Sequence, residues 1–182
     1  MPGEKNRQSE KKFPAVLIIG EIMLAIVLFR YLVNFTSLVS PIDNPGLRML
    51  INLISIVFSI AMAMLSVRAI LGIPSARPES WCTVVRSSVT LFISNTVYGL
   101  LEANNILYAG FVFPIELIGI NMVVVLAIMF LPSVRKYYTP ALTNVPPIKE
   151  WVKFIFYLPL NDSQEYRFGY PGEEVDPELI VR

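Results

Sequence analysis

The sequence predicts an all-α membrane protein, in which a bundle of four transmembrane helices precedes a short interfacial amphipathic helix and an extended tail. Four long apolar stretches fill residues 14 to 131, and no hydrophilic domain separates them. Hydrophobic residues make up 54% of the chain and charged residues 16%, against about 25% charged residues in soluble proteins. Because a helix needs roughly 20 mainly apolar residues to cross a hydrocarbon core, each stretch is long enough for one crossing.

These stretches divide the chain into four parts. Residues 1–13 form a polar, basic leader, and residues 14–131 form the transmembrane domain. Residues 132–160 are a juxtamembrane segment with an amphipathic helix, and residues 161–182 form an acidic and aromatic tail. We expect the first span to be retained, since its apolar run is too long for a signal peptide and has no small-residue cleavage site. The predicted spans are Pro14–Val33, Met49–Val67, about Cys82–Ala103 and about Ala109–Leu131.

Basic residues near the ends of the spans predict the orientation of the chain. With four crossings, both termini and the connection between the second and third spans lie on one side. Arg30 and Arg48 fall on the opposite side. Cytoplasmic loops carry an excess of Lys and Arg, so we expect both termini to be cytoplasmic. The eleven basic residues on the side of the termini are Lys5, Arg7, Lys11, Lys12, Arg68, Arg77, Arg86, Arg135, Lys136, Lys149 and Lys153.

Proline and glycine mark the expected helix ends. Pro14 stands in the first turn of the first span, where its missing N–H costs nothing. Gly72, Pro74 and Pro78 break the chain between the second and third spans. Pro114 lies inside the fourth predicted span, and we expect it to kink that helix or to make it start late.

The second span carries a face of small and polar residues at steps of three and four. Such a face lets a neighbouring backbone approach closely in a membrane. We interpret it as a helix-packing face, with a pore lining as the alternative. Its members are Asn52, Ser55, Ser59, Ala63 and Ser66.

Polar and ionisable residues also occur within the apolar segments. A charged group at the bilayer centre costs about 2.5–3.5 kcal/mol on insertion scales, so each should face protein or water. Two interpretations compete: these residues tie the helices together, or they line a path for an ion or a small solute. The predicted polar intramembrane cluster contains Arg30, Asn95, Tyr98, Glu102, Asn105, Glu116 and Asn121.

The juxtamembrane segment contains residues typical of a membrane interface or of a docking surface. Tyr137 and Tyr138 stand beside Arg135 and Lys136, as in an interfacial anchor. The helix predicted over about Ile148–Leu158 lies in the headgroup plane or docks on a partner subunit, and both alternatives stay open. Its apolar face contains Ile148, Trp151, Val152, Ile155 and Leu158.

The tail carries aromatic residues that disordered tails normally lack. Tyr166, Phe168 and Tyr170 are spaced for an extended contact. We expect this tail to run along another protein or a second copy of the chain, with an exposed flexible tail as the alternative.

Several functional classes are disfavoured by composition. The chain has no histidine and a single cysteine, Cys82, so we expect neither a metal site nor a cofactor. A net charge of +1 gives no support to nucleic-acid binding. Phosphate-binding loops and serine-hydrolase motifs are also missing from the sequence.

The leading hypothesis is therefore a non-catalytic integral membrane subunit that helps to assemble a larger complex. Its expected partners are the lipid bilayer and either other membrane-protein subunits or further copies of itself. A homo-oligomeric channel or transporter module that uses the intramembrane Glu and Asn residues is the alternative. An intramembrane enzyme that uses Glu102 and Glu116 is a third hypothesis, although the sequence supplies no partner group for acid–base chemistry.

Overall fold

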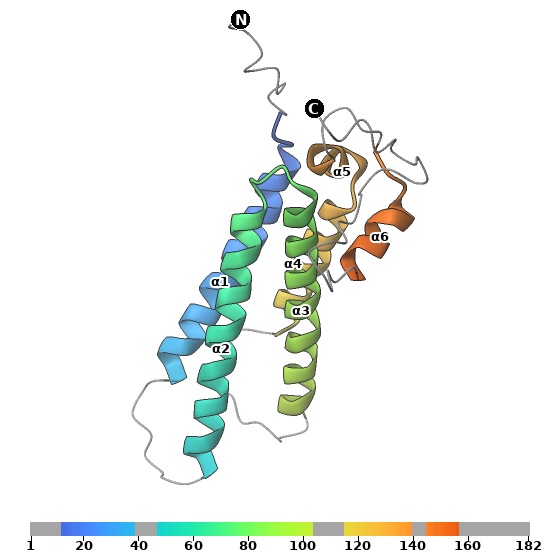
Figure 1. The fold of residues 1–182 in the computed structure, drawn as a ribbon. Helices are drawn as coiled ribbons and strands as arrows, with labels where there is room; N and C mark the ends of the chain where they lie inside the picture. The colour runs from blue at the N-terminus through green and yellow to red at the C-terminus, as the bar shows by residue number, and fades with distance from the viewer. Residues whose placement is uncertain (1–11, 39–46, 104–114, 140–144, 157–182) are drawn as a thin grey trace, which may run out of the picture.

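The computed structural model describes residues 12–38, 47–103, 115–139 and 145–156, and all the regular structure in these residues is helical (Figure 1). Four helices form the body of the molecule and two short helices follow. The helices are α1 (Val16–Leu38), α2 (Leu47–Gly72), α3 (Pro78–Ala103), α4 (Ile115–Met129), α5 (Pro132–Tyr138) and α6 (Ile148–Phe156).

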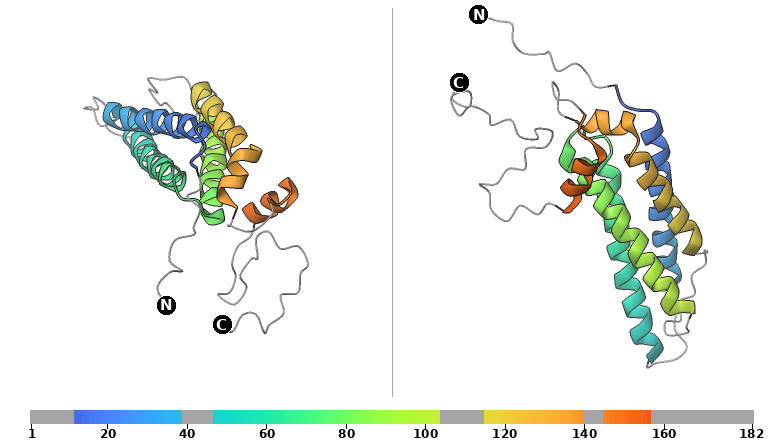
Figure 2. Two further views of the ribbon diagram at one scale, coloured as in Figure 1. Left: turned by 90° about the horizontal axis from the view of Figure 1, so that it is seen from above. Right: turned by 90° about the vertical axis from the view of Figure 1, so that its right-hand side faces the viewer.

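The first four helices surround a common axis. α1 contacts α2 and α4, and α3 contacts the same two helices from the other side. Figure 2 shows this ring from one end, with α6 outside it beside α3. Each helix buries one apolar stripe and exposes another. In α1, for example, Leu24 and Val27 are fully buried, whereas Ile22 and Phe29 are exposed.

Helices that are apolar on all sides are typical of a membrane environment. α1, α2 and α3 are each long and apolar enough to cross a membrane. α4 and α5 pass the same criterion as a pair that bends by 69° at the break between them. The described residues thus form a bundle with three or four candidate spans, which confirms the predicted fold class of a multi-pass helical membrane protein.

The helices differ from the predicted spans mainly at their ends. α1 continues to Leu38 rather than ending at Val33, α2 covers Leu47–Gly72, and α3 begins at Pro78 rather than at Cys82. The apolar stretches in the sequence mark the residues that lie in the hydrocarbon core, but a helix can extend beyond the core until a helix-breaking residue ends it. Gly72 and Pro78 are the breaking residues around the connection between α2 and α3.

Two prolines, Pro114 and Pro132, stand at the two ends of the described helix in the fourth predicted span. The described part of α4 begins at Ile115, directly after Pro114, and its 15 residues extend about 22 Å. The helix ends at Met129 rather than at Leu131. Leu131 adopts the extended conformation that a following proline favours, with φ −61° and ψ 141°. Pro132 has no N–H to continue the helix, so the chain turns there into α5.

One glycine is required where α2 meets α3. A Cβ atom at Gly72 would lie 2.9 Å from Cγ2 of Val84, and Val84 is fully buried. It would also lie 3.4 Å from the backbone oxygen of Ser80. This close approach brings the end of α2 against the first turns of α3.

Candidate functional site

Two groups of polar side chains are candidates for function. The first lies at the end of the bundle where α2 and α4 stop and α3 begins. The last carbonyl groups of a helix have no partner within the helix and need other donors. Five aromatic and basic side chains donate hydrogen bonds to backbone oxygens at or just after helix ends, and a sixth, Trp151, packs against one of them. We call these six residues the helix-end cluster: Trp81, Arg86, Arg135, Tyr137, Tyr138 and Trp151.

Two tyrosines of α5 hold the end of α2. The hydroxyl of Tyr138 donates to the backbone oxygen of Ile73, and that of Tyr137 donates to the backbone oxygen of Pro74, both at 2.7 Å. Both tyrosine side chains are buried. The sequence predicts them as anchors at the membrane surface, and this stays a prediction. Within the chain, their hydroxyls donate to carbonyls of the turn that follows α2.

The end of α4 is held from two directions. The indole N–H of Trp81 donates to the backbone oxygen of Met129 at 2.8 Å. Arg135 donates from Nε to the backbone oxygen of Phe130 at 3.2 Å and from Nη1 to that of Pro146 at 3.1 Å. Arg135 therefore joins the bend between α4 and α5 to the segment that leads into α6.

The amphipathic helix α6 docks against α3 of its own chain. Trp151 meets Trp81 edge to face, with ring centroids 4.5 Å apart. Arg86 donates from Nε to the backbone oxygen of Ile155 at 2.7 Å, so a cation stands at the negative end of the α6 dipole. Cys82 makes a weak contact from Sγ to the backbone oxygen of Phe154 at 3.6 Å. The sequence predicts that this helix contacts either the lipid headgroups or a partner subunit. In the structure, one face of α6 contacts α3 of the same chain, so only its other face is available for lipid or a partner.

The remaining residues predicted for that surface have different environments. Ile148 is 51% exposed, and Ile155 is half-buried. Val152 and Phe156 extend the exposed apolar stripe of α6. Leu158 and the tail residues 161–182 lie outside the described residues.

The second candidate group is a polar interior between α1, α2 and α3. The hydroxyl groups of Ser55 and Tyr98 share a hydrogen bond of 2.8 Å between α2 and α3. The ring of Tyr98 stacks on Phe58 at 4.7 Å, and Phe58 meets Tyr31 of α1 at 6.3 Å. Asn95, one turn from Tyr98, is also buried. Polar groups therefore reach the centre of the bundle.

The small-residue face of α2 points into this interior. Ser55, Ser59 and Ser66 are buried, and Ala63 is half-buried. Ser66 donates its hydroxyl to the backbone oxygen of Met62 in the preceding turn at 2.9 Å. The side chain of Asn52 lies outside the described residues. Of this face, Ser55 makes a hydrogen bond to another helix, and its role as a packing face stays a prediction.

The predicted polar cluster is only partly described. Arg30 in α1 and Asn121 in α4 are half-buried. Glu102 belongs to α3 and Glu116 to α4, but their side chains lie outside the described residues, as does all of Asn105.

The pairing of α3 with α4 gives the relative heights of these residues. A Cβ atom at Gly119 would lie 3.8 Å from Cε2 of Phe92. Because α3 and α4 run antiparallel, Asn95 (three residues after Phe92) and Glu116 (three residues before Gly119) are displaced from this contact in the same direction along the bundle.

Three further hydroxyl groups contribute to the polar interior. Tyr31, Ser59 and Ser88 are fully buried, and their oxygen atoms have no hydrogen-bond partner among the described residues. Buried polar atoms usually have a hydrogen-bond partner, so three buried hydroxyl groups without one among the described residues are unusual. The same part of the chain holds no group of three or more His, Cys, Asp or Glu residues that could bind a metal ion.

Comparison with protein families, with curated proteins and with solved structures finds no match to this chain. The class of protein rests on the fold itself, which is that of a multi-pass helical membrane protein.

Sequence reasoning missed the role of three residues in the helix-end cluster. The sequence pattern gives Arg86 only as a charge that sets the orientation, gives Arg135 as such a charge and as part of an interfacial anchor, and does not identify Trp81. Arg86 carried a usable signal, because a charge inside an otherwise apolar helix needs a buried partner.

Proposed function

We propose that this chain is a non-catalytic integral membrane subunit that packs within, and helps to assemble or stabilise, a larger membrane-protein complex. The observation that carries the proposal is how the polar side chains are used. Trp81, Arg86 and Arg135 hold helix ends of the chain itself, and Ser55 with Tyr98 joins α2 to α3. Such contacts stabilise a fixed shape. The outer surface of the bundle is left to large apolar side chains, which can pack against other membrane helices as well as lipid.

Both termini are proposed to be cytoplasmic. The support is the distribution of charge along the bundle. Lys12, Arg77, Arg135 and Lys149 belong to segments at the end where α1 begins and α2 and α4 stop, whereas Arg30 lies toward the other end of α1. This asymmetry follows the positive-inside rule.

A photo-crosslinking scan in native membranes tests the assembly role. A photoreactive amino acid is placed at one exposed position on each of α1 to α4: Phe29, Met64, Val97 and Val123. We expect at least one position to form a discrete protein adduct, and the same chain to co-purify in mild detergent. Met122, which is fully buried, is the control and should form no adduct. Lipid adducts alone at all four positions, together with a lone monomer in detergent, would contradict the proposal.

A channel or transporter module is the second candidate function. It is favoured by the buried hydroxyls of Tyr31, Ser59 and Ser88 and by the buried amide side chain of Asn95. In this case Glu116→Gln and Glu102→Gln should change ion or proton flux through liposomes that contain the chain. Identical flux in both variants and the parent protein would remove this candidate.

A further inference from the structure

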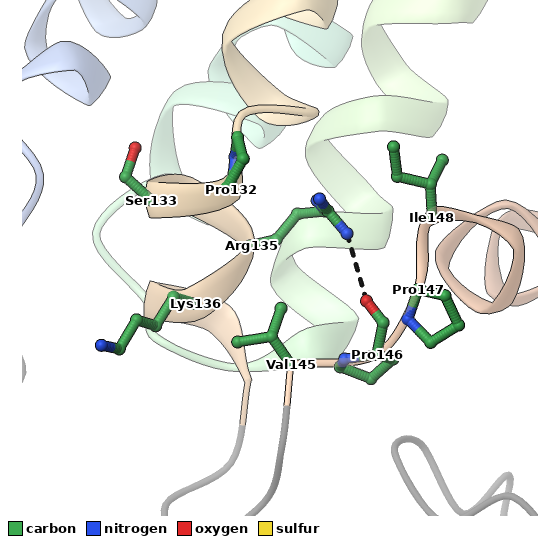
Figure 3. A pocket seen from close by; sticks show the side chains of 8 residues that line it. All are labelled: Pro132, Ser133, Arg135, Lys136, Val145, Pro146, Pro147 and Ile148. Atoms are coloured by element: carbon green, nitrogen blue, oxygen red, sulfur yellow. Dashed lines mark hydrogen bonds between the residues drawn. The ribbon is translucent and has the colours of Figure 1, made fainter.

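A pocket of about 500 Å³ lies between α5 and the segment that leads into α6 (Figure 3). One side is formed by α5, and the other by residues 145–148. Figure 3 shows Arg135 reaching from α5 toward Pro146, while Ser133 and Lys136 lie at the α5 side of the space. Its volume falls in the usual range of small-molecule sites. The lining residues are Pro132, Ser133, Arg135, Lys136, Val145, Pro146, Pro147 and Ile148.

The electrostatics of the pocket favour an anion. Arg135 is only 8% exposed, and its guanidinium group stays charged under all ordinary conditions. Its hydrogen-bond partners are two neutral backbone oxygens, and it forms no ion pair with any described acidic residue. Lys136 adds a second cation to the lining, and none of the described residues that line the pocket is acidic. Because a buried charge is costly without a counter-charge, a bound anion would stabilise this arrangement.

The apolar side of the pocket narrows the class of anion. Pro132, Val145 and Ile148 line it, and Val145 and Ile148 are exposed. The exposed stripe of α6 continues from Ile148 through Val152 to Phe156, which is 78% exposed. A small soluble anion would gain nothing from these side chains, whereas a lipid has acyl chains to place against them.

The location of the pocket agrees with a lipid ligand. It lies just past Met129, where α4 ends and the chain turns at Pro132. Phosphate groups lie at the ends of membrane spans, and basic pockets at the cytoplasmic ends of membrane helices bind acidic headgroups. Lys149, exposed on α6 directly after the lining residue Ile148, adds positive charge nearby.

We propose that this pocket binds the phosphate headgroup of an anionic phospholipid. Arg135 faces the phosphate, the exposed Lys136 adds positive charge at the α5 side of the pocket, and the acyl chains run along Ile148 and the exposed stripe of α6. The bound lipid joins α5 to α6 and so helps to fix the end of the bundle.

Native mass spectrometry of the full chain in a non-ionic detergent tests this site. The probes are phosphatidylglycerol, phosphatidylcholine, glycerol 3-phosphate and inorganic phosphate. We expect a single phosphatidylglycerol adduct at concentrations where phosphatidylcholine gives none, and no competition from the two soluble phosphates. Lys136→Gln should weaken the adduct about fivefold, the factor typical of one basic residue near an anionic lipid.

The controls separate this site from general charge attraction. Arg135→Gln should abolish the adduct, but Arg135 also ties the bend between α4 and α5 to the segment before α6. The exposed Lys136 therefore carries the test. Lys153→Gln is the matched control, because Lys153 pairs with Glu150 at 3.0 Å and does not line the pocket. Equal loss in Lys136→Gln and Lys153→Gln would overturn the proposal. So would equal binding of phosphatidylcholine, or binding of a soluble phosphate as tight as that of phosphatidylglycerol.

Discussion

Single atoms decide how closely α2 can approach α3. A methyl group at position 72 would press on Cγ2 of the buried Val84. We therefore expect Gly72→Ala to lower the free energy of unfolding by about 1–3 kcal/mol, as overpacking does elsewhere. Gly20→Ala is the control, since a Cβ there would meet Cδ1 of Ile73 at an ordinary 3.9 Å. This control should be neutral or stabilising by about 0.5–1 kcal/mol. Thermal unfolding in detergent measures both, and equal midpoints would contradict the expectation.

Two buried tyrosine hydroxyls should make opposite contributions to stability. Tyr138→Phe removes the donor to the backbone oxygen of Ile73 and leaves that oxygen unpaired. We expect a loss of about 1–3 kcal/mol. Tyr31→Phe removes a hydroxyl group with no hydrogen-bond partner among the described residues, and should be neutral or stabilising. Denaturant titration in micelles compares the two variants. A larger loss in Tyr31→Phe than in Tyr138→Phe would show that the Tyr31 hydroxyl has an important partner.

At the scale of elements, one hydrogen bond joins α2 to α3 inside the bundle. A double-mutant cycle with Ser55→Ala and Tyr98→Phe isolates its contribution. We expect a coupling energy of about 0.6 kcal/mol and at most about 1.7, the range found for hydrogen bonds between membrane helices. The control cycle pairs Tyr98→Phe with Ser66→Ala, because Ser66 donates within its own helix. Coupling of equal size in both cycles would mean that the Ser55 contact has no specific effect.

The docking of α6 should depend on Arg86. Arg86→Met removes the donor to the end of α6 but keeps much of the apolar stem of the side chain. We expect faster amide hydrogen exchange in residues 148–156, with protection of α1 to α4 unchanged. Arg68→Met, at an exposed position on α2, should leave exchange in α6 as it is. Unchanged exchange in Arg86→Met would show that the contact between Trp81 and Trp151 is sufficient to hold α6.

At the scale of the whole molecule, the number of crossings fixes which segments share a side. Cys82 is buried, and Cys82→Ala provides a background for single cysteines. With four crossings, cysteines at the exposed positions Lys12, Arg77 and Lys149 should react with a membrane-impermeant thiol reagent from the same side. A cysteine at Asn44, between α1 and α2, should react from the opposite side.

The result at Lys149 decides between three and four crossings. If the cysteine at Lys149 reacts from the side of Asn44, α4 and α5 do not complete a crossing. The bent pair would then enter and leave the membrane on one side.

Much of the fold follows from local sequence properties. Lipid selects apolar segments by their summed transfer free energy, and each segment contributes independently of the others. The four apolar stretches therefore predicted the bundle, and Pro114 marked the residue before the described start of α4. Helix ends were less predictable, because capping contacts such as those of Tyr138 and Trp81 come from residues far away in the sequence.

For the candidate sites too, the sequence predicted the features that depend on spacing within one helix, but not the contacts between helices. The period of Ser55, Ser59 and Ser66 identified a shared face, since helical spacing is local. It could not identify Tyr98 as the partner of Ser55, because this depends on how two helices are rotated and displaced against each other.

The sequence by itself determined that this chain lives in a membrane, roughly where its helices cross, and which residues share a helical face. Insertion into hydrocarbon depends on the apolar composition of each segment, and a shared helical face depends on residue spacing. Both are local properties that can be read from the sequence. Only the tertiary structure decided that Tyr137, Tyr138 and Trp151 turn inward, that Arg135 lies buried beside a pocket, and that α6 rests on α3. Each of these outcomes depends on contact between segments that are distant in the sequence: a side chain of one segment meets a backbone carbonyl or an apolar surface of another.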